Sequence, residues 1–300
     1  MARNKKEISR QTRNQGTRLF SNLMISPTVI ILLIMTAYPM VFTVYYSFTN
    51  YNYLKHLKKP YSFIAFKNYV KLFQNHYFQI AVVNTIKFTL LAVLFEMTLG
   101  LLVAVFVHSL KKGQKIMRIL ILLPYLLPTV TVALAWKMML SSNYGIVNQI
   151  LTTIGLTPHN WFMETGTAFY TVLAIDVWQN VPFVFLLLYA VLQTVDMDQY
   201  EAAKIDGANT WQLFWNVTIP NIKGGIALCA LLRTIDTFRI FDKVNILTGG
   251  GPAGTTSTIT QFLYTYGIKN LDFGFGSAGA IVMTILVLIL SSAYIKRAVQ

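Results

Sequence analysis

Four residues spaced for one side of a helix form the first group in the sequence that could bind a ligand. They are Asp176, Gln179, Asn180 and Phe183. Because a helix turns by about 100° per residue, offsets of three, four and seven nearly superimpose. An aromatic ring beside amide and carboxylate groups suits a polyhydroxylated ligand, whose ring faces stack while its hydroxyls need donors and acceptors. The spacing therefore predicts a sugar-type binding surface.

A second group lies between the fourth and fifth apolar runs of the chain. Asp198 is expected to cap a short helix, with Glu201 three residues later closing a capping box. Gly207 is expected to end this helix in the left-handed conformation. Ala202 and Ala203 leave one side of the helix thin, so the surface of another protein could approach its backbone closely.

A second short helix is expected to follow directly. Thr210 would cap it and Pro220 would stop it, because proline lacks the N–H that a helix interior needs. One face of this helix would carry Trp211, Phe214, Trp215 and Thr218.

Metal, redox and nucleotide chemistry are not indicated. Cys229 is the single cysteine and has no partner for a disulfide or a metal site. The glycines of 274–279 match a dinucleotide motif but lead into an apolar run with no acidic residue after them. The glycines of 249–254 have phosphate-loop spacing, but Thr255 replaces the essential lysine. The histidines are scattered without ligand spacing, at His56, His76, His108 and His159.

The elements that must position these groups are apolar and long. Only 12% of the 300 residues are charged and 55% are hydrophobic, whereas a soluble domain usually carries about 25% charged residues. A bilayer core takes about 20 helical residues to cross. The sequence predicts an all-α integral membrane protein with six transmembrane helices, at about 23–48, 81–108, 118–140, 167–193, 224–247 and 275–295.

Several of these runs contain ionisable groups, among them Glu96, Lys137 and Asp176. Such groups are costly at membrane depth unless they face protein or a water-filled cavity. The helices are therefore expected to surround something polar.

The net charge of +14 is arranged for orientation in a lipid bilayer rather than for nucleic acid. With the N-terminus inside, 14 Lys and Arg lie in inner segments and 6 in outer ones. Because cytoplasmic loops carry the excess of basic residues, both termini are predicted to be cytoplasmic in a cell (inner or plasma) membrane. The first run is too long for a cleavable signal and should remain as an anchor.

Three regions are expected along the chain. Residues 1–20 form a basic tail, residues 21–78 the first transmembrane helix with an external aromatic loop and a short helix, and residues 79–296 the main transmembrane domain. The segment of the two short helices occupies 196–222 within that domain.

This segment resembles the EAA loop of permeases from binding-protein-dependent ATP-binding-cassette importers. Glu-Ala-Ala, Gly207 and Pro220 match at the family spacing, with Val217 and Ile219 as conservative replacements. The resemblance implies the type I importer fold and a helix that sits in a cleft of a separate ATPase dimer. It places ATP and Mg²⁺ in that partner and no cofactor in this chain, which would itself be a transport subunit and no enzyme. The implied coupling residues are Glu201, Ala202, Ala203, Asp206, Gly207 and Pro220.

Further motifs are similar to those of carbohydrate-importer permeases, in particular the first of two permeases in maltose-type systems. They include Asn84-Thr85, the turn 247–252 and the segment 273–278. The resemblance implies a homologous second permease, an extracytoplasmic solute-binding protein and a carbohydrate substrate. The implied substrate positions are Asp176, Trp178, Gln179, Asn180, Phe183, Arg233 and Thr237.

Alternatives remain for the substrate and for the machinery. Arg233 could clamp a carboxylate with a bidentate pair, which would suit an acidic or amino sugar. It could instead be neutralised by acids at offsets of three, within the set Arg233, Asp236, Arg239 and Asp242. A polyol or sugar-phosphate would use the same machinery, whereas a secondary transporter or membrane enzyme would need repeated halves or a convergent catalytic set, which the sequence lacks.

Overall fold

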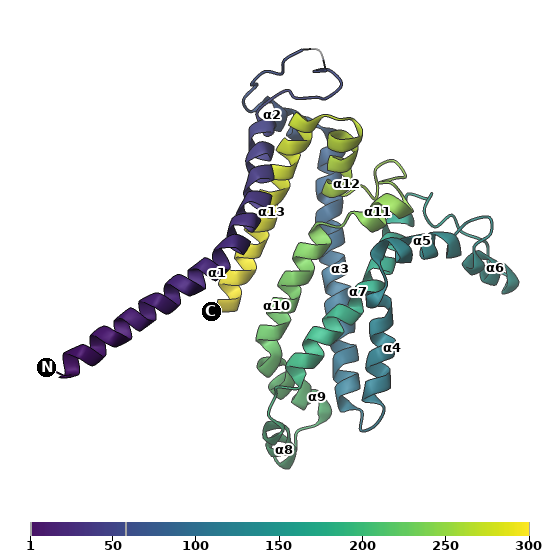
Figure 1. Ribbon diagram of the computed structural model, residues 1–300. Helices are drawn as coiled ribbons and strands as arrows, with labels where there is room; N and C mark the ends of the chain where they lie inside the picture. Colours follow the sequence, from purple (N-terminus) through teal and green to yellow (C-terminus); the bar gives the residue numbers. More distant parts are fainter. Residues whose placement is uncertain (1, 58, 300) are drawn as a thin grey trace.

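The computed structural model describes residues 2–57 and 59–299, and the side chains of 23–57 and 59–292. The described residues form helices, with one isolated bridge between Thr49 and Phe63. Figure 1 shows the long helices α1, α3, α7, α10 and α13 running between two ends, with α8 and α9 at one end and the α1–α2 loop at the other.

The α-helices are α1 Ala2–Ser47, α2 Lys67–Gln74, α3 His76–Ser109, α4 Gln114–Leu126, α5 Thr129–Met139, α6 Ile146–Thr153, α7 Ala168–Leu192, α8 Met197–Ile205, α9 Thr210–Leu213, α10 Ile219–Phe238, α11 Asp242–Leu247, α12 Ile259–Leu263 and α13 Phe273–Val299. Two π-helical turns, Phe214–Thr218 and Tyr264–Lys269, complete the set.

Four of these helices are long and apolar enough to cross a membrane: α1 over Leu23–Ser47, α3, α7 and α13. A fifth span is added if the bent pair α4 and α5 is counted as one. The all-helical membrane architecture is therefore confirmed, whereas the count of six spans is not.

The third predicted span is a broken one. Helices α4 and α5 meet at 88° instead of continuing straight. Leu127 has extended backbone angles, φ −77° and ψ 139°, and Pro128 follows it. Proline disfavours the helical conformation of the residue before it and lacks an N–H donor, so the chain turns at this point.

The fifth predicted span is interrupted as well. Helix α10 ends at Phe238, and α11 begins at Asp242. Helix α10 also carries Lys223, Arg233 and Asp236, and it is not among the helices apolar enough to cross alone. Its place in the bundle must come from contacts with other helices.

Pro220 does not stop the second short helix, contrary to expectation. Helix α9, the turn Phe214–Thr218 and α10 form one continuous helical stretch, with Pro220 in the first turn of α10. Pro220 therefore lies just after the π-helical turn Phe214–Thr218, where the regular hydrogen bonding of the α-helix is already interrupted.

The first helix extends over more than the predicted span. Helix α1 begins at Ala2, and Pro27 and Pro39 lie inside it. Its apolar side chains from Leu23 to Met40 are almost all exposed. Figure 1 shows the N-terminal half of α1 projecting away from the other helices and the rest of α1 running beside α13. The basic side chains of the predicted tail, residues 1–20, lie outside the described side chains.

Helices α3 and α7 pack closely at a glycine of α3, Gly100. A Cβ atom at Gly100 would lie 2.5 Å from Cγ1 of Val184 and 3.2 Å from the backbone nitrogen of Phe185. This close approach holds α3 against the helix that carries the predicted binding residues.

Candidate functional site

A polar pocket of about 280 Å³ lies where α7, α10 and α11 meet. It brings together four of the predicted substrate residues: Asp176 and Asn180 from α7, and Arg233 and Thr237 from α10. Because the 88° turn between α4 and α5 carries Thr129, this helix pair also reaches the pocket. The remaining lining residues are Tyr125, Asp236, Arg239, Ile240, Phe241, Asp242 and Lys243.

Arg233 is held by a buried carboxylate from another helix. Its Nε and one terminal nitrogen donate to the two carboxylate oxygens of Glu96 on α3, at 2.7 and 3.0 Å. Arg233 is 4% exposed and Glu96 is fully buried. The bidentate geometry that we expected Arg233 to offer a substrate is therefore used by Glu96, and only its other terminal nitrogen faces Asp236, at 3.5 Å.

The alternative in which four charges spaced by three neutralise one another holds only for its first pair. Among the described residues, Arg233 contacts Asp236, whereas Arg239 and Asp242 form no ion pair within 4.0 Å. Helix α10 ends at Phe238, so the helical spacing does not continue to these last two residues.

Asp176 forms the second buried ion pair. Lys243 Nζ on α11 donates to its Oδ1 at 2.5 Å, and Asn180 Nδ2 donates to the same atom at 2.9 Å. The other carboxylate oxygen, Oδ2, is buried without a hydrogen-bond partner among the described residues. An ionised oxygen in this position is an acceptor for a hydroxyl or amide of a bound molecule.

Gln179, Phe183 and Trp178 do not line the pocket. Gln179 Nε2 donates to the carbonyl of Leu127 at 3.0 Å, which satisfies a backbone group left free where α4 and α5 break. The ring of Phe183 lies 5.9 Å from the guanidinium carbon of Arg233, so it packs behind the pocket.

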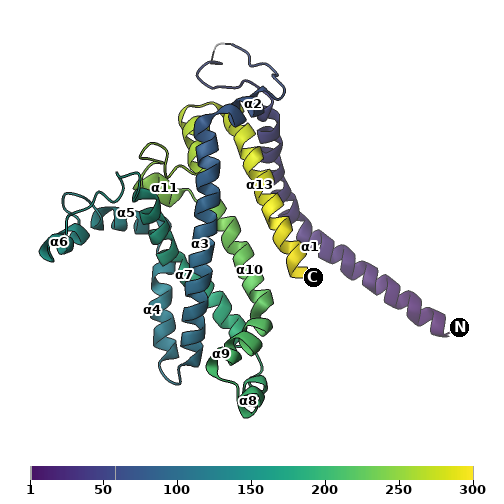
Figure 2. The ribbon, with the colours of Figure 1, turned by 180° about the vertical axis from the view of Figure 1, so that it is seen from behind.

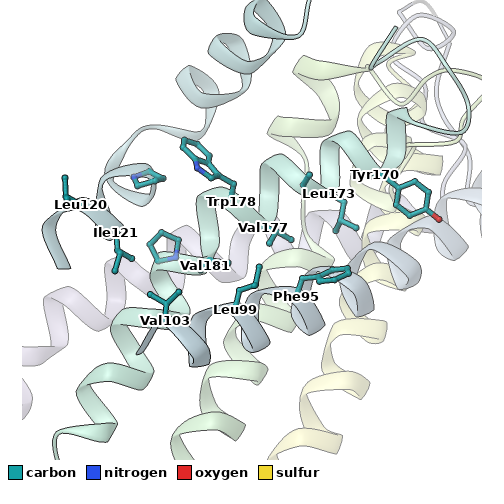
Figure 3. Close-up of a pocket in the computed structure, with 13 residues that line it drawn as sticks. Phe95, Leu99, Val103, Leu120, Ile121, Tyr170, Leu173, Val177, Trp178 and Val181 are labelled. Carbon is teal, nitrogen blue, oxygen red and sulfur yellow. The ribbon is translucent and has the colours of Figure 1, made fainter. Parts of the chain in front are cut away.

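Trp178 faces a different, apolar cavity between α3, α4 and α7. This cavity measures about 710 Å³, and Figure 3 shows Trp178, Val181 and Phe95 among the side chains around it. Trp136 meets Trp178 edge to face at 5.4 Å on the neighbouring side. The four-residue surface predicted from α7 is therefore split between the polar pocket, the α4–α5 break and the packing behind Arg233.

Lys243 is the functional candidate that the sequence reasoning missed. It is 3% exposed and lies inside the predicted fifth span. The rule that singled out Glu96 and Asp176, an ionisable group at membrane depth, applies equally to it.

The two predicted short helices, α8 and α9, are present at the end of the bundle away from the α1–α2 loop, but their N-caps differ from those predicted. Asp196 caps α8 and accepts the N–H of Asp198 at 3.1 Å. Asn209 caps α9 in a capping box with Gln212, with contacts of 2.8 and 2.9 Å. In both places a capping residue just ahead of the predicted one has the extended backbone that a cap requires. The conformation predicted for Gly207 is confirmed, at φ +84°.

Helix α8 exposes the residues expected to couple to another protein. Glu201, Ala202, Asp206 and Gly207 are exposed, Ala203 is partly buried, and Ile205 is 86% exposed. Pro220 is also exposed but lies apart, in α10.

Helix α8 is tied to the helix that reaches the polar pocket. The Tyr200 hydroxyl lies 3.0 Å from Oγ1 of Thr218, and Asn221 Nδ2 donates to Gln199 Oε1 at 2.7 Å. The helical stretch that begins at α9 continues into α10, which carries Arg233. Figure 2 shows α8 and α9 below the lower end of α10. Helix α8 is therefore connected through these hydrogen bonds to the helical stretch that carries Arg233 at the pocket.

Among the described residues, no group of three or more His, Cys, Asp or Glu side chains is placed to hold a metal ion.

A bundle of membrane-crossing helices with a polar centre and an exposed helix at one end defines a membrane transport subunit. Residues 96–299 match the family of binding-protein-dependent transport system inner membrane components, and the chain belongs to this family. This membership replaces the alternatives of a secondary transporter and a membrane enzyme.

Two relatives and one solved structure illustrate the similarity. The chain is 38% identical over 240 residues to the trehalose/maltose transport system permease protein MalF of Thermococcus litoralis, covering 80% of each chain. It is 32% identical over 293 residues to the sulfoquinovosyl glycerol transport system permease protein SmoG of Agrobacterium fabrum, covering 97% of this chain and 94% of the relative. Its fold is similar to a chain in the crystal structure of a bacterial transporter involved in the import of the acidic polysaccharide alginate, with a TM-score of 0.84, 23% identity, and coverage of 96% of this chain and 98% of that one.

Proposed function

We propose that this chain is one of two homologous permeases in an ATP-driven importer that carries a carbohydrate across the cell membrane. An extracytoplasmic solute-binding protein delivers the substrate. An ATPase dimer on the cytoplasmic side binds ATP and Mg²⁺, and this chain holds no cofactor. Both termini and α8 lie in the cytoplasm, and residues 79–296 form the transmembrane domain.

The observation that carries the proposal is the exposed face of α8 at one end of the bundle. An apolar side chain as exposed as Ile205, beside Glu201 and two alanines, is suited to a protein partner rather than to water. Hydrogen bonds join α8 to Thr218 and Asn221, so a movement that the partner imposes on α8 would reach α10 within the membrane.

The polar pocket supports a neutral, hydroxyl-rich substrate. Asp176 Oδ2 accepts a hydroxyl, and Asn180 adds an amide group at the same wall. Glu96 already neutralises Arg233, so this guanidinium is not free to attract a carboxylate. The name of the Thermococcus litoralis relative, which refers to trehalose and maltose, points to the same class of substrate.

A charged or phosphorylated sugar, or another polyol, is the second candidate. Arg239 and Asp242 line the pocket and form no ion pair among the described residues, so they could meet a charged substituent. The sulfonated sugar derivative and the acidic polysaccharide named for two similar proteins support this alternative. The rates at which one reconstituted complex takes up a neutral sugar and a charged sugar distinguish the two candidate substrate classes.

The test of the proposal is Glu201→Ala in the assembled transporter. If Glu201 makes a charge-assisted contact with the ATPase, its removal should lower the copurified ATPase about tenfold or more, because truncating one partner leaves the other charge unpaired. Substrate uptake should fall in parallel, while the yield of extracted permease should not change. Glu164→Ala is the matched control, since it removes an exposed carboxylate in the loop before α7, apart from α8. Normal uptake and normal ATPase recovery with Glu201→Ala would refute the coupling role.

A further inference from the structure

The end of the molecule opposite α8 carries a basic hollow of about 770 Å³. It lies between the α1–α2 loop and the start of α2. Four lysines line it against a single acidic residue, Asp272. The four are Lys55, Lys59, Lys67 and Lys71.

The charges of these lysines are not satisfied within the chain. Among the described residues, none of the four forms an ion pair within 4.0 Å. The Asp272 carboxylate accepts the backbone N–H of Phe275 at 3.2 Å, and Lys71 lies over the ring of Phe275 at 5.0 Å. Like charges that face one hollow repel each other, and an acidic partner removes this repulsion.

The hollow has a well-defined frame. The buried Asn68 donates to the carbonyls of Ser47 and Thr49 at 2.9 and 2.8 Å. The backbone N–H of Tyr53 donates to the carbonyl of Leu271 at 2.9 Å, and the backbone N–H of Gly274 donates to the carbonyl of Tyr51 at 2.8 Å. These bonds join the loop to the start of α13. These bonds fix the first residues of the loop and the start of α2, which together form the base of the hollow.

We propose that this basic hollow is the docking surface for an acidic loop or helix end of the solute-binding protein. This inference rests on the proposed function, which places the hollow on the extracytoplasmic side. Figure 1 shows the α1–α2 loop standing beyond the ends of α1 and α13, where a protein that arrives from outside meets it first. A lipid headgroup would instead lie level with the helix ends. Carboxylates that enter the hollow would pair with Lys55 and Lys59 on the loop and with Lys67 on α2.

The experiment uses the native permease–ATPase complex in nanodiscs of phosphatidylcholine. The probe is the solute-binding protein that stimulates ATP hydrolysis by this native complex. The variant is the triple substitution Lys55→Gln, Lys59→Gln and Lys67→Gln, which retains Lys71 because it packs on Phe275. Lys269→Gln is the matched control, an external lysine outside the hollow.

The triple variant should bind the solute-binding protein about tenfold more weakly and with a shallower dependence on salt, since charge pairs steer and strengthen such contacts. Basal ATP hydrolysis and the recovery of assembled complex should match the native protein, and Lys269→Gln should bind normally. Hexaglutamate should compete with the solute-binding protein for the native complex, whereas hexaglutamine should not.

Equal binding by the native and triple-variant complexes would overturn this inference and leave the proposed function standing. An affinity loss that occurs only in nanodiscs with anionic lipid, and not in phosphatidylcholine, would assign the lysines to lipid headgroups and would also overturn it. A native complex that no solute-binding protein stimulates would overturn the proposed function, and this inference with it.

Discussion

Glu96 and Arg233 place two opposite charges in the interior of a membrane protein, and each is costly there without the other. Their contact joins α3 to α10 by two hydrogen bonds. The pair therefore holds the pocket together rather than binding substrate directly.

Arg233→Ala should destabilise the assembled permease by about 3–5 kcal/mol, because it leaves Glu96 buried and unpaired. The measurement is the midpoint of thermal aggregation of the detergent-solubilised complex. The double substitution Glu96→Gln and Arg233→Gln should recover much of the loss, since neither side then carries an unpaired charge. A double variant no more stable than Arg233→Ala would contradict the pairing.

Asp176 lines the pocket and keeps one buried carboxylate oxygen, Oδ2, without a hydrogen-bond partner among the described residues, and we expect this oxygen to contribute to substrate affinity. The double variant Asp176→Asn and Lys243→Gln removes both charges of their pair. It should raise the KM for uptake about tenfold or more, because a hydrogen bond to a charged group contributes about 1.5–3 kcal/mol. ATPase recovery should be unchanged.

Trp178→Leu is the control, because Trp178 faces the apolar cavity instead of the pocket. It should leave the KM for uptake unchanged. If the KM rises for Trp178→Leu and not for the Asp176 double variant, the substrate would bind at the apolar cavity beside Trp178 and not at the polar pocket.

Helix α8 depends on Gly207 for its direction. At φ +84° a side chain strains the backbone, and Gly207→Val should cost about 1–2 kcal/mol locally. We expect α8 to be misoriented, so copurified ATPase and uptake should both fall while permease yield stays constant. Gly166→Val is the matched control, because Gly166 has no positive φ and nothing lies within 4 Å of its added Cβ. Equal losses for both variants would show that bulk, and not backbone conformation, is responsible.

The helices show where sequence reasoning succeeds. Long uninterrupted runs such as those of α3, α7 and α13 were predicted because length and apolarity alone determine them. The break after Leu127 was missed because it lies inside a run that remains apolar across the turn. The break after Phe238 was missed although the charged residues Arg239, Asp242 and Lys243 interrupt the predicted run there. The caps were misassigned by one or two residues, since several neighbouring Asp, Asn and Thr side chains can each serve.

The candidate site was only partly predictable for a related reason. Helical periodicity correctly placed Asp176 and Asn180 together. It could not distinguish a polar face that meets the pocket from one that satisfies a backbone break, as Gln179 does. Nor could it find the partner of Arg233, which lies 137 residues away in sequence.

The two ends of the molecule should face opposite compartments. In a Cys229→Ser background, Leu57→Cys on the α1–α2 loop should react with an impermeant maleimide in intact cells. Asp198→Cys on α8 should react only after permeabilisation. Both positions are exposed, so access to reagent depends on the side of the membrane. Labelling of Asp198→Cys in intact cells would reverse the orientation given by the basic residues.

The Glu96–Arg233 pair also has a consequence for the order in which the chain is built. Helix α10 is not apolar enough to enter lipid by itself, whereas α3 is, and α3 leaves the ribosome first. Once α3 is inserted, the ion pair between Glu96 and Arg233 would then retain α10 in the membrane during biosynthesis. With a glycosylation tag after α10, Glu96→Leu should reduce the fraction of nascent chains in which α10 integrates. Unchanged integration would show that the Glu96–Arg233 pair acts only in the folded protein and not during insertion.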